Sequence, residues 1–376
     1  MMKVLFFIPS LKGGGAERVM VEILRSVDHE RIEPVLILLE PYENSPFKEY
    51  LPPEIKVIVV DRSSDAPLNK VRQYAGFIRT VFGEKPHLIM SMLTHCNIMA
   101  ASLKLIYRIR VIICEHITVS EVIKTKEGGR MLWFSTRHLI KIFYRFADKI
   151  VAVSEGIKAN LVEEFNIPPH KTEVLYNPID LGRISELSKV SVEHVFFKER
   201  VPVLLSVGRL VPQKGFDILL KAFRKVLEEM DARLIILGGG QGKEPLLRLA
   251  GDLAITGKVS FAGFQENPYK FMSKADIFVL PSRYEGLPMV ILEAMACGAP
   301  VVSSDCKSGP REILQDGRHG VLVPVEDVDA LSAAISRLLR DKTLRKSFSA
   351  TAKERAKDFA AGKIVSRYEE IICKSA

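Results

Sequence analysis

The chain has 376 residues, a formal net charge of +9 at pH 7 and a hydrophobic fraction of 47%. This composition is that of a globular protein rather than a disordered one, and the length exceeds what a single core usually holds, so two domains are expected. The positive charge favours anionic ligands or surfaces. Because no zinc-finger, helix-turn-helix or RNA-recognition motif accompanies it, nucleic acid is the weaker interpretation.

The cysteines and the apolar runs indicate a protein of the cytosol. The five cysteines lack C-x-x-C spacing and are odd in number, which predicts reduced thiols and argues against a disulfide framework or a zinc site. The apolar run at the start of the chain is short and ends in glycines, so it is interpreted as a strand rather than a signal peptide. No run approaches the roughly 18 apolar residues that a membrane span requires.

Short runs rich in valine, isoleucine and leucine alternate with helical patterns along the chain. Such runs are typical of parallel strands covered by helices on both faces. In the first half, strands are expected at residues 3–8, 34–39, 55–60, 87–92, 110–115, 149–154 and 171–176. In the second half, they are expected at residues 201–208, 232–240, 258–264, 275–282, 299–305 and 320–324. The sequence therefore predicts an α/β protein with two doubly wound, Rossmann-like domains.

The domain boundary is expected between residues 176 and 186, where Pro178 and a polar stretch interrupt the pattern. The domains are placed at residues 1–180 and 181–376, and the last helix, at 360–376, is expected to pack back on the first domain. Ligands of such sheets bind beyond the carboxyl ends of the strands, so a ligand-binding cleft between the two domains is expected.

Residues 9–24, PSLKGGGAERVMVEIL, place three glycines between an expected strand and an expected helix. Gly13, Gly14 and Gly15 permit close approach, and the first turn of the helix offers backbone N–H groups to an anion. The spacing matches neither G-x-G-x-x-G nor a P-loop, so it predicts neither kind of nucleotide site. We interpret the segment as an anion-binding turn, with an ordinary strand-to-helix turn as the alternative.

Arg209 and Lys214 follow the expected strand at 201–208 and precede a helix that has Gly215 near its start. Two cations at the carboxyl end of a central strand fit a diphosphate, the arginine as a planar fork and the lysine as a point charge. A pair of solvated loop cations is the alternative interpretation.

The stretch SRYEGLPMVILEAMACGAP, residues 282–300, places Glu285 in a turn and Glu293 among apolar residues of an expected helix. A carboxylate in such surroundings is costly unless a donor hydrogen-bonds it. Sugar hydroxyls are such donors, so the missing partner is interpreted as a ligand, with a hexose at Glu285 and a ribose at Glu293. Gly286 and Leu287 are expected to offer backbone N–H groups to phosphate oxygen, and Pro288 is expected in the first helical turn.

The segment EGLPMVILE has the E-x7-E pattern, and GGAERV, VGRLVPQKG, FAGF and GAPVVSSD accompany it in a fixed order. Across almost the whole chain these motifs resemble the retaining GT-B glycosyltransferases, in the large family that includes sucrose synthase and the mannosyltransferases of lipid glycosylation. The resemblance implies a GT-B fold with two Rossmann-like domains facing across a cleft, a nucleotide-sugar donor, and transfer with retention of configuration.

The resemblance also implies roles for individual residues at the donor diphosphate and sugar. Gly14 and Gly15 would face the diphosphate, and Arg209 and Lys214 would neutralise it. Glu285 would bind the donor sugar near its 3- and 4-hydroxyls.

At the two ends of the donor, the resemblance implies contacts from other parts of the chain. Glu293 would bind the ribose, and the backbone around Gly263 and Phe264 would meet the base. His116, at the end of the expected strand at 110–115, matches a family histidine that holds the 6-hydroxyl of the sugar. A lone histidine is otherwise more often structural.

By the same resemblance the favoured mechanism is front-face displacement, in which the departing diphosphate takes the proton of the acceptor. Fixed cations would then stabilise the charge that develops on the leaving group. No metal or other cofactor is implied, and Asp327 in the one D-x-D segment is interpreted as a helix N-cap. The residues expected to carry catalysis are His116, Glu285, Arg209 and Lys214.

Residues 129–150 predict a helix on which an apolar stripe lies beside a basic one. Such a helix suits an anionic membrane surface, and a helix packed on its own domain with solvated cations is the alternative. The basic surface is equally suited to the diphosphate of a lipid-linked sugar. The residues expected to contact the acceptor or a membrane are Lys70, Arg72, Arg79, Trp133, Arg137, Lys141 and Arg145.

The leading hypothesis is a retaining transferase that moves a hexose or N-acetylhexosamine from a UDP-sugar to a glycan, linked to polyprenyl diphosphate, at the cytoplasmic face of the cell membrane. Residues 308–317, SGPREILQDG, are similar to transferases that add N-acetylgalactosamine or related sugars to such glycans. The alternatives are a UDP-sugar epimerase of the same fold, an inactive sugar-nucleotide-binding regulator and a nicotinamide dehydrogenase. The dehydrogenase lacks its G-x-G-x-x-G fingerprint.

Overall fold

The computed structural model describes residues 1–60, 69–121 and 129–374, and the side chains of residues 69–70 and 129–135 lie outside this description. The chain divides into two compact units, Met1–Pro178 with Ala361–Ala376, and Ile179–Ala360. Each unit is described by itself below. Within the described ranges, no helix combines the length and the apolar character needed to cross a bilayer.

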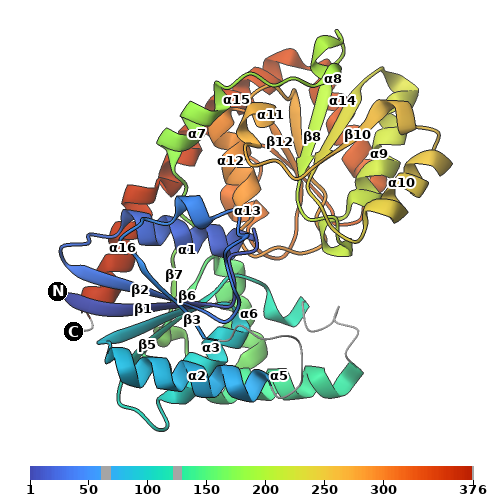
Figure 1. Ribbon diagram of the computed structural model, residues 1–376. Helices are drawn as coiled ribbons and strands as arrows, with labels where there is room; N and C mark the ends of the chain where they lie inside the picture. Colours follow the sequence, from blue (N-terminus) through green and yellow to red (C-terminus); the bar gives the residue numbers. More distant parts are fainter. Residues whose placement is uncertain (61–68, 122–128, 375–376) are drawn as a thin grey trace. The chain divides into compact units, whose positions relative to one another are not determined.

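The first unit is built on a seven-stranded parallel sheet in the order β3-β2-β1-β4-β5-β6-β7 (Figure 1). Its strands are β1 (Met2–Ile8), β2 (Ile32–Leu38), β3 (Lys56–Val59), β4 (Leu88–Met92), β5 (Arg110–Glu115), β6 (Lys149–Ala152) and β7 (Thr172–Val174). β1 is buried along most of its length because helices cover both faces of the sheet, which explains its nearly continuous apolar sequence.

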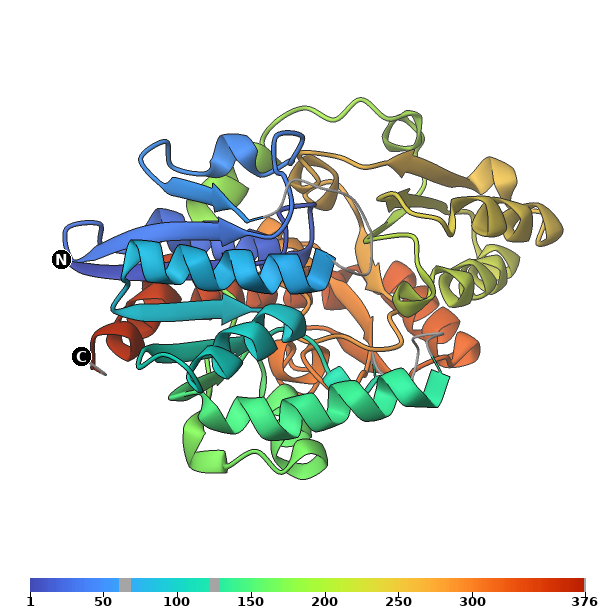
Figure 2. The same ribbon diagram turned by 60° about the horizontal axis from the view of Figure 1, so that its bottom comes forward.

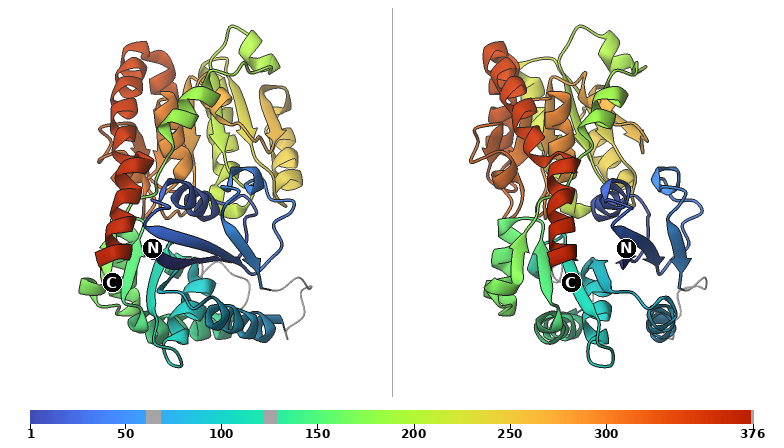
Figure 3. Two further views of the ribbon diagram at one scale, coloured as in Figure 1. Left: turned by 60° about the vertical axis from the view of Figure 1, so that its left-hand side comes forward. Right: turned by 90° about the vertical axis from the view of Figure 1, so that its left-hand side faces the viewer.

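Helices form two layers around this sheet. One layer contains α1 (Gly15–Ser26) and α16 (Ala361–Lys374), which pack against each other although they come from opposite ends of the chain (Figure 3). The other layer contains α2 (Asn69–Glu84), α3 (Thr94–Leu103), α5 (Gly129–Phe143) and α6 (Glu155–Phe165) (Figure 2). The C-terminal helix therefore packs on the N-terminal domain through the side chains of its buried stripe, among them Tyr368 and Ile372.

The second unit repeats this plan with a six-stranded parallel sheet in the order β10-β9-β8-β11-β12-β13. Its strands are β8 (Val203–Val207), β9 (Arg233–Leu237), β10 (Val259–Gly263), β11 (Ile277–Leu280), β12 (Val301–Ser304) and β13 (Val321–Val323). Its longer helices are α7 (Leu181–Ser188), α9 (Phe216–Glu229), α10 (Lys243–Asp252), α12 (Met289–Cys297), α14 (Val328–Arg340) and α15 (Lys342–Ala356), and its short ones include α11 (Tyr269–Met272) and α13 (Pro310–Ile313). The thirteen expected strands are thus all present, in two doubly wound sheets.

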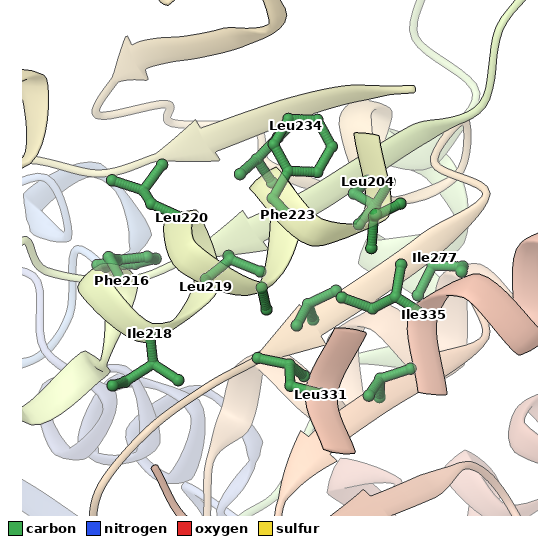
Figure 4. Close-up of a cluster of buried hydrophobic side chains, with 14 of the residues drawn as sticks. Leu204, Phe216, Ile218, Leu219, Leu220, Phe223, Leu234, Ile277, Leu331 and Ile335 are labelled. Carbon is green, nitrogen blue, oxygen red and sulfur yellow. The ribbon is translucent and has the colours of Figure 1, made fainter. Parts of the chain in front are cut away.

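A continuous apolar core joins the second sheet to α9 and α14 (Figure 4). Phe223 of α9, Ile335 of α14 and Leu234 of β9 are fully buried in it. At about 25 cal/mol per Å² of apolar surface removed from water, side chains of this size dominate the stability of the layer. This core holds the carboxyl ends of β8 and β11 in a fixed relation, which positions the loops that follow them.

One expected element differs in extent. The helix predicted over residues 129–150 ends at Phe143, and a 3-10 turn, Tyr144–Phe146, leads directly into β6. The ring of Tyr144 is fully buried and its hydroxyl donates to Glu115 at the end of β5 (2.6 Å). This tertiary contact turns the chain toward the sheet, and local helical periodicity does not reveal it.

Candidate functional site

The loops after β8 and β11 meet at the carboxyl edge of the second sheet. These strands are neighbours, yet the chain leaves β8 toward β9 and leaves β11 toward β12, in opposite directions along the sheet. Such a switch point is where open α/β sheets bind ligands. The loop after β8 carries Arg209 and Lys214, and the loop after β11 carries Glu285. Tertiary structure therefore brings together three of the predicted site residues.

Lys214 and Glu285 form an ion pair. The Nζ atom of Lys214 donates to Oε1 of Glu285 at 2.6 Å, with 14% of the lysine side chain and 8% of the glutamate side chain exposed. Ser282 Oγ donates to the same carboxylate oxygen at 2.7 Å. The expectation that Glu285 would lack a partner within the protein is therefore wrong, because two protein groups hydrogen-bond its carboxylate.

A close backbone approach fixes the position of Lys214. Its stem lies over Gly208, where an added Cβ would stand 3.4 Å from Cγ and Cδ of the lysine. The next residue, Gly215, has φ +64 and lies against the carbonyl oxygen of Pro281 so closely that a Cβ would overlap it. Only glycine permits both the positive φ and this contact. The loop after β8 is thereby pressed against the end of β11, which brings the lysine to Glu285.

Glu293 lies in the middle of α12 and is 1% exposed. The hydroxyl of Tyr269, from α11, donates to its Oε1 at 3.3 Å. The carboxylate is thus held by a neighbouring helix, which corrects the expectation that only a ribose would be its partner. The sequence does not reveal Tyr269 as a partner, because it lies 24 residues from Glu293 and the packing of α11 against α12 brings the two side chains together.

The turn between the two glutamates is buried. Gly286, Leu287 and Pro288 have little exposed surface, and Gly309 of the following loop packs against the backbone of Gly286. Pro288 is the N-cap residue of α12, with φ −70 and ψ 104, and the helix starts at Met289. Its predicted place in the first helical turn is therefore off by one position, since its extended ψ belongs to the residue that precedes a helix.

Arg209 differs from Lys214 in being exposed. Within the described residues, its guanidinium takes part in no hydrogen bond or ion pair, so its donors face solvent. A second glycine-rich loop packs against the residue that precedes Arg209. Gly238 has φ +134, and a Cβ at this position would overlap the carbonyl oxygen of Gly208. Gly240 lies in the same way against Leu210. The loop at 238–242 was not singled out from the sequence, although its three consecutive glycines after a strand were a usable signal.

Gly263 and Phe264 follow the edge strand of the second sheet. Gly263 ends β10 at a register shift, has φ +72, and accepts a hydrogen bond from the N–H of Gly238 (2.8 Å). Phe264 is 58% exposed. An exposed aromatic ring beside an irregular strand end offers a stacking surface, as a planar base requires.

In the first unit, the expected glycine turn joins β1 to α1. Gly13 has φ +104, Gly14 is the N-cap of α1, and Gly15 is its first residue. The carboxylate of Glu17 lies against Gly14, where it complements the positive end of the helix dipole. An anion at this turn would meet that acid, so the turn alone is a weaker anion site than its three glycines suggest.

His116 directly follows β5, as expected. Burial lowers the pKa of its imidazole to about 3, so the ring is neutral at pH 7. Its Nε2 atom is buried and has no hydrogen-bond partner among the described residues. A neutral ring with a buried, unused nitrogen suits hydrogen bonding to a ligand hydroxyl better than it suits charge stabilisation.

A buried carboxyl group beneath His116 was missed. Glu115 is fully buried, and its Oε2 accepts from Tyr144 (2.6 Å) and Thr94 (3.1 Å), while the N–H of His116 donates to Oε1 (3.2 Å). Burial raises the pKa of Glu115 to about 7, and these donors limit the rise. Leu93, beside Thr94, has φ +72, a strained conformation for leucine that clusters at functional sites.

The basic residues expected at an acceptor or membrane divide into two kinds. Arg137 donates to the carbonyl of Glu164 (2.9 Å), and Arg145 donates to that of Asn166 (3.1 Å), so both cap the end of α6. This supports the alternative in which α5 packs on its own domain. Arg72 and Arg79 of α2 are exposed and Lys141 is half-buried, whereas the side chains of Lys70 and Trp133 lie outside the described part of the structure.

Asp327 is the N-cap of α14, where its carboxylate accepts from the N–H of Ala330 (2.8 Å). The interpretation of this D-x-D segment as a cap is confirmed. In the part of the chain that the structure describes, no group of three or more histidine, cysteine or acidic side chains is arranged to hold a metal ion.

Both halves of the chain are similar in sequence to known protein families. Residues 13–183 match the family described as Glycosyltransferase Family 4, and residues 191–355 match Glycosyl transferases group 1. The chain is 32% identical over 371 residues to the N-acetylgalactosamine-N,N'-diacetylbacillosaminyl-diphospho-undecaprenol 4-alpha-N-acetylgalactosaminyltransferase of Campylobacter jejuni, covering 97% of each chain.

Solved structures share the fold. Anabaena Alr3699/HepE, in complex with UDP and glucose, superposes with a TM-score of 0.82 at 21% identity, over 100% of both chains. Sucrose-phosphate synthase from Thermosynechococcus elongatus superposes with a TM-score of 0.85 at 18% identity, over 100% of this chain and 99% of that one.

Lys214→Met is expected to destabilise the fold by on the order of 3 kcal/mol, because it removes the cationic partner of a buried carboxylate. Lys214→Met with Glu285→Gln is expected to recover most of this loss, as measured by urea unfolding. Lys225→Met, which breaks an exposed pair with Asp329, is the matched control and should cost below about 1 kcal/mol. Equal losses for both lysines would show that the buried pair does not stabilise the site.

The stability of the Glu115→Gln variant relative to wild type is expected to increase as the pH rises from 5 to 8. Because the folded state raises the pKa of Glu115 to about 7, it holds a proton that the unfolded chain releases near its ordinary value of 4.5, so stability is lost across this range. Glutamine removes that loss. The measurement is the thermal midpoint of variant and wild type at each pH.

The matched control for this pH series is Glu173→Gln. Although burial opposes it, hydrogen bonding by Lys149 holds the pKa of Glu173 below its ordinary value, so the trend should not appear there. A flat difference in thermal midpoint between Glu115→Gln and wild type from pH 5 to 8 would contradict the raised pKa of this buried carboxyl group.

Proposed function

The chain belongs to the GT-B glycosyltransferases built from family 4 and group 1 domains, and from this premise we propose that it transfers an N-acetylhexosamine from a UDP-sugar to a polyprenyl-diphosphate-linked glycan. The observation that carries the proposal is the Lys214–Glu285 pair at the switch point of the second sheet. It places one group suited to phosphate and one suited to sugar hydroxyls on the same small surface.

The donor site is assigned to the second unit. Lys214 and the exposed guanidinium of Arg209 supply positive charge for a diphosphate, and Glu285 accepts hydrogen bonds from the hexose. Glu293 accepts from the ribose in place of, or together with, Tyr269. Phe264 offers its ring to the base. The Anabaena protein with the same fold was solved with UDP and glucose, in keeping with this class of donor.

Donor binding has to change the ion pair. Lys214 is bound to Glu285 in the free protein, so its ammonium must turn part of its hydrogen bonding toward the phosphate when a donor enters. An ammonium has three donors, so it can contact a carboxylate and a phosphate oxygen together. The pair therefore links recognition of the diphosphate to the position of the carboxylate that faces the sugar.

The acceptor class is proposed from the relative in Campylobacter jejuni. Its name describes an α-linked transfer to an undecaprenyl diphosphate glycan, and it aligns with 97% of this chain. The sequence of residues 308–317, which is similar to that of such transferases, supports the same acceptor class. Gly309 places this loop against the turn that follows Glu285.

The reaction is proposed to retain the configuration at the anomeric carbon and to need no metal. Lys214 and Arg209 would stabilise the charge that develops on the departing diphosphate, and the diphosphate would take the proton of the acceptor hydroxyl. Glu285 would orient the sugar, and neutral His116 would hydrogen-bond one of its hydroxyls. No covalent nucleophile is required in this scheme.

Glu285→Gln is expected to lower transfer by about 100-fold while UDP binds as well as or better than it does to wild type. The carboxylate serves the sugar, and its removal leaves Lys214 available to the diphosphate. Transfer is measured from UDP-N-acetylgalactosamine to a polyprenyl-diphosphate-linked N-acetylhexosamine, with the product anomer assigned by NMR, and UDP binding is measured by calorimetry.

Lys214→Met gives the opposite pattern and serves as the companion variant. It is expected to weaken UDP by about 10-fold or more, since one charge-assisted hydrogen bond contributes about 1.5–3 kcal/mol. UDP affinity unchanged in Lys214→Met, or lost equally in both variants, would remove the donor assignment.

We also propose a peripheral position on the cytoplasmic face of the cell membrane. Supporting it, α2, α3 and α5 lie in one helical layer on the first sheet (Figure 2), and α2 carries the exposed Arg72 and Arg79. The exposed apolar residues of this layer and of the loop after α3 are Val71, Phe82, Leu105, Ile106, Leu139 and Ile142. Apolar and basic side chains on one surface favour an anionic bilayer.

Arg72→Glu with Arg79→Glu is expected to reduce binding to phosphatidylglycerol vesicles by about 30-fold or more, at about 1 kcal/mol for each basic residue near the surface. Binding is measured by vesicle sedimentation, with phosphatidylcholine vesicles as the lipid control. Arg224→Glu with Arg248→Glu, on α9 and α10 of the second unit, changes the net charge equally and should retain binding. Equal loss for both pairs would assign the effect to total charge and reject this surface.

A further inference from the structure

Arg283 lies between the two loops that carry the ion pair. Its Nη1 donates to the carbonyl oxygen of Pro212 (2.6 Å) and to Oδ1 of Asp217 (2.9 Å), its Nη2 donates to Oδ2 of Asp217 (2.8 Å), and its Nε donates to Glu326 (2.6 Å). Pro212 and Asp217 stand on either side of Lys214 in the chain, and Arg283 stands two residues before Glu285. One guanidinium therefore binds both flanks of the lysine from the loop of the glutamate.

The backbones of the two loops are joined at the same place. The N–H of Arg283 donates to the carbonyl oxygen of Gln213 (2.8 Å), and the side-chain amide of Gln213 donates to the carbonyl oxygen of Tyr284 (2.9 Å). Gln213 immediately precedes Lys214, and Tyr284 immediately precedes Glu285. These bonds set the separation of the residues next to each member of the pair.

Negatively charged neighbours hold the guanidinium of Arg283 in place between the two loops. Although burial opposes the shift, hydrogen bonding by Arg283 keeps the pKa of Asp217 below its ordinary value, so the carboxylate is ionised at pH 7. Asp217 also lies in the first turn of α9, where a negative charge is favoured by the helix dipole. With four hydrogen bonds already made, the guanidinium has at most one N–H left for a ligand.

We propose that Arg283 is a positioning residue, which holds Lys214 and Glu285 at the spacing needed to bind diphosphate and sugar together. The inference rests on the proposed function, because it presumes that Lys214 binds the donor diphosphate. Arg283 itself is committed to protein partners, unlike the exposed Arg209, so it acts through the lysine and glutamate. The fork geometry is essential to this role, since an ammonium cannot make the paired bonds to Asp217.

The test measures UDP affinity by calorimetry in Arg283→Lys, Arg283→Met, Lys214→Met and the double variant Arg283→Met with Lys214→Met. Both single Arg283 variants are expected to weaken UDP by about 10-fold, because a small misplacement of a binding group is costly. In the double variant, loss of Arg283 is expected to add less than about 2-fold to the loss caused by Lys214→Met alone. General loosening of the fold would instead add its full effect in both backgrounds.

Arg233→Met is the matched control. Arg233 is also bound to two acids, Asp231 and Glu199, and to the carbonyl oxygen of Ala232, but it lies at the amino end of β9. It is expected to lower the thermal midpoint while leaving UDP affinity within about 2-fold of wild type, since the carboxyl edge of the sheet is not disturbed. If Arg233→Met weakens UDP as much as Arg283→Met does, the positioning role is rejected.

The remaining outcomes distinguish the positioning role of Arg283 from the assignment of Lys214 to the diphosphate. If Lys214→Met weakens UDP and neither Arg283 variant does, the proposed function stands and the positioning role is overturned. If Lys214→Met leaves UDP affinity unchanged, the diphosphate assignment fails and the inference fails with it. Should Arg283→Met not fold, Arg283→Lys in the wild-type and Lys214→Met backgrounds provides the same comparison, with Asp217→Asn expected to reproduce its loss.

Discussion

A buried ion pair between Lys214 and Glu285 is the constraint on which the candidate site depends. Burying two charges is favourable only when geometry is good and their remaining hydrogen bonds are satisfied, because desolvation opposes their attraction. Here Ser282 shares the carboxylate oxygen, and the loops bearing the pair are joined by their backbones and by Arg283. Much of the local structure therefore keeps two opposite charges close together at the carboxyl edge of the second sheet.

The scaffold makes this arrangement possible at the carboxyl edge of the sheet. Parallel strands end at the same level, so loops distant in sequence become neighbours there, and the chain leaves β8 and β11 in opposite directions along the sheet. Gly215 and Gly238 allow the loops to approach within contact of one another. A side chain at either position would separate Lys214 from Glu285 or displace the segment that bears Arg209.

The first unit uses burial in another way. Glu115 and His116 lie at the end of β5, where burial raises the pKa of the acid to about 7 and lowers the pKa of the imidazole to about 3. The imidazole is therefore neutral at pH 7, and the carboxyl group keeps its proton to a far higher pH than an exposed glutamate does. The imidazole of His116 therefore adds no charge at this edge, and its buried Nε2 atom has no hydrogen-bond partner among the described residues. In the second unit, the loop after β8 carries two cations instead, Lys214 and Arg209.

The sequence by itself determined the two doubly wound sheets and the identity of the motif residues, because buried parallel strands have continuous apolar runs and E-x7-E, with its companion motifs, is specific. The partners of those residues were decided by tertiary structure alone. Ser282 and Tyr269 reach the two glutamates, Tyr144 reaches Glu115, and Arg283 reaches Asp217, across 3 to 66 positions of sequence. Hydrogen bonds and ion pairs act over a few ångströms of space, and local periodicity carries no information about which distant side chains the packing of sheets and helices brings within that range.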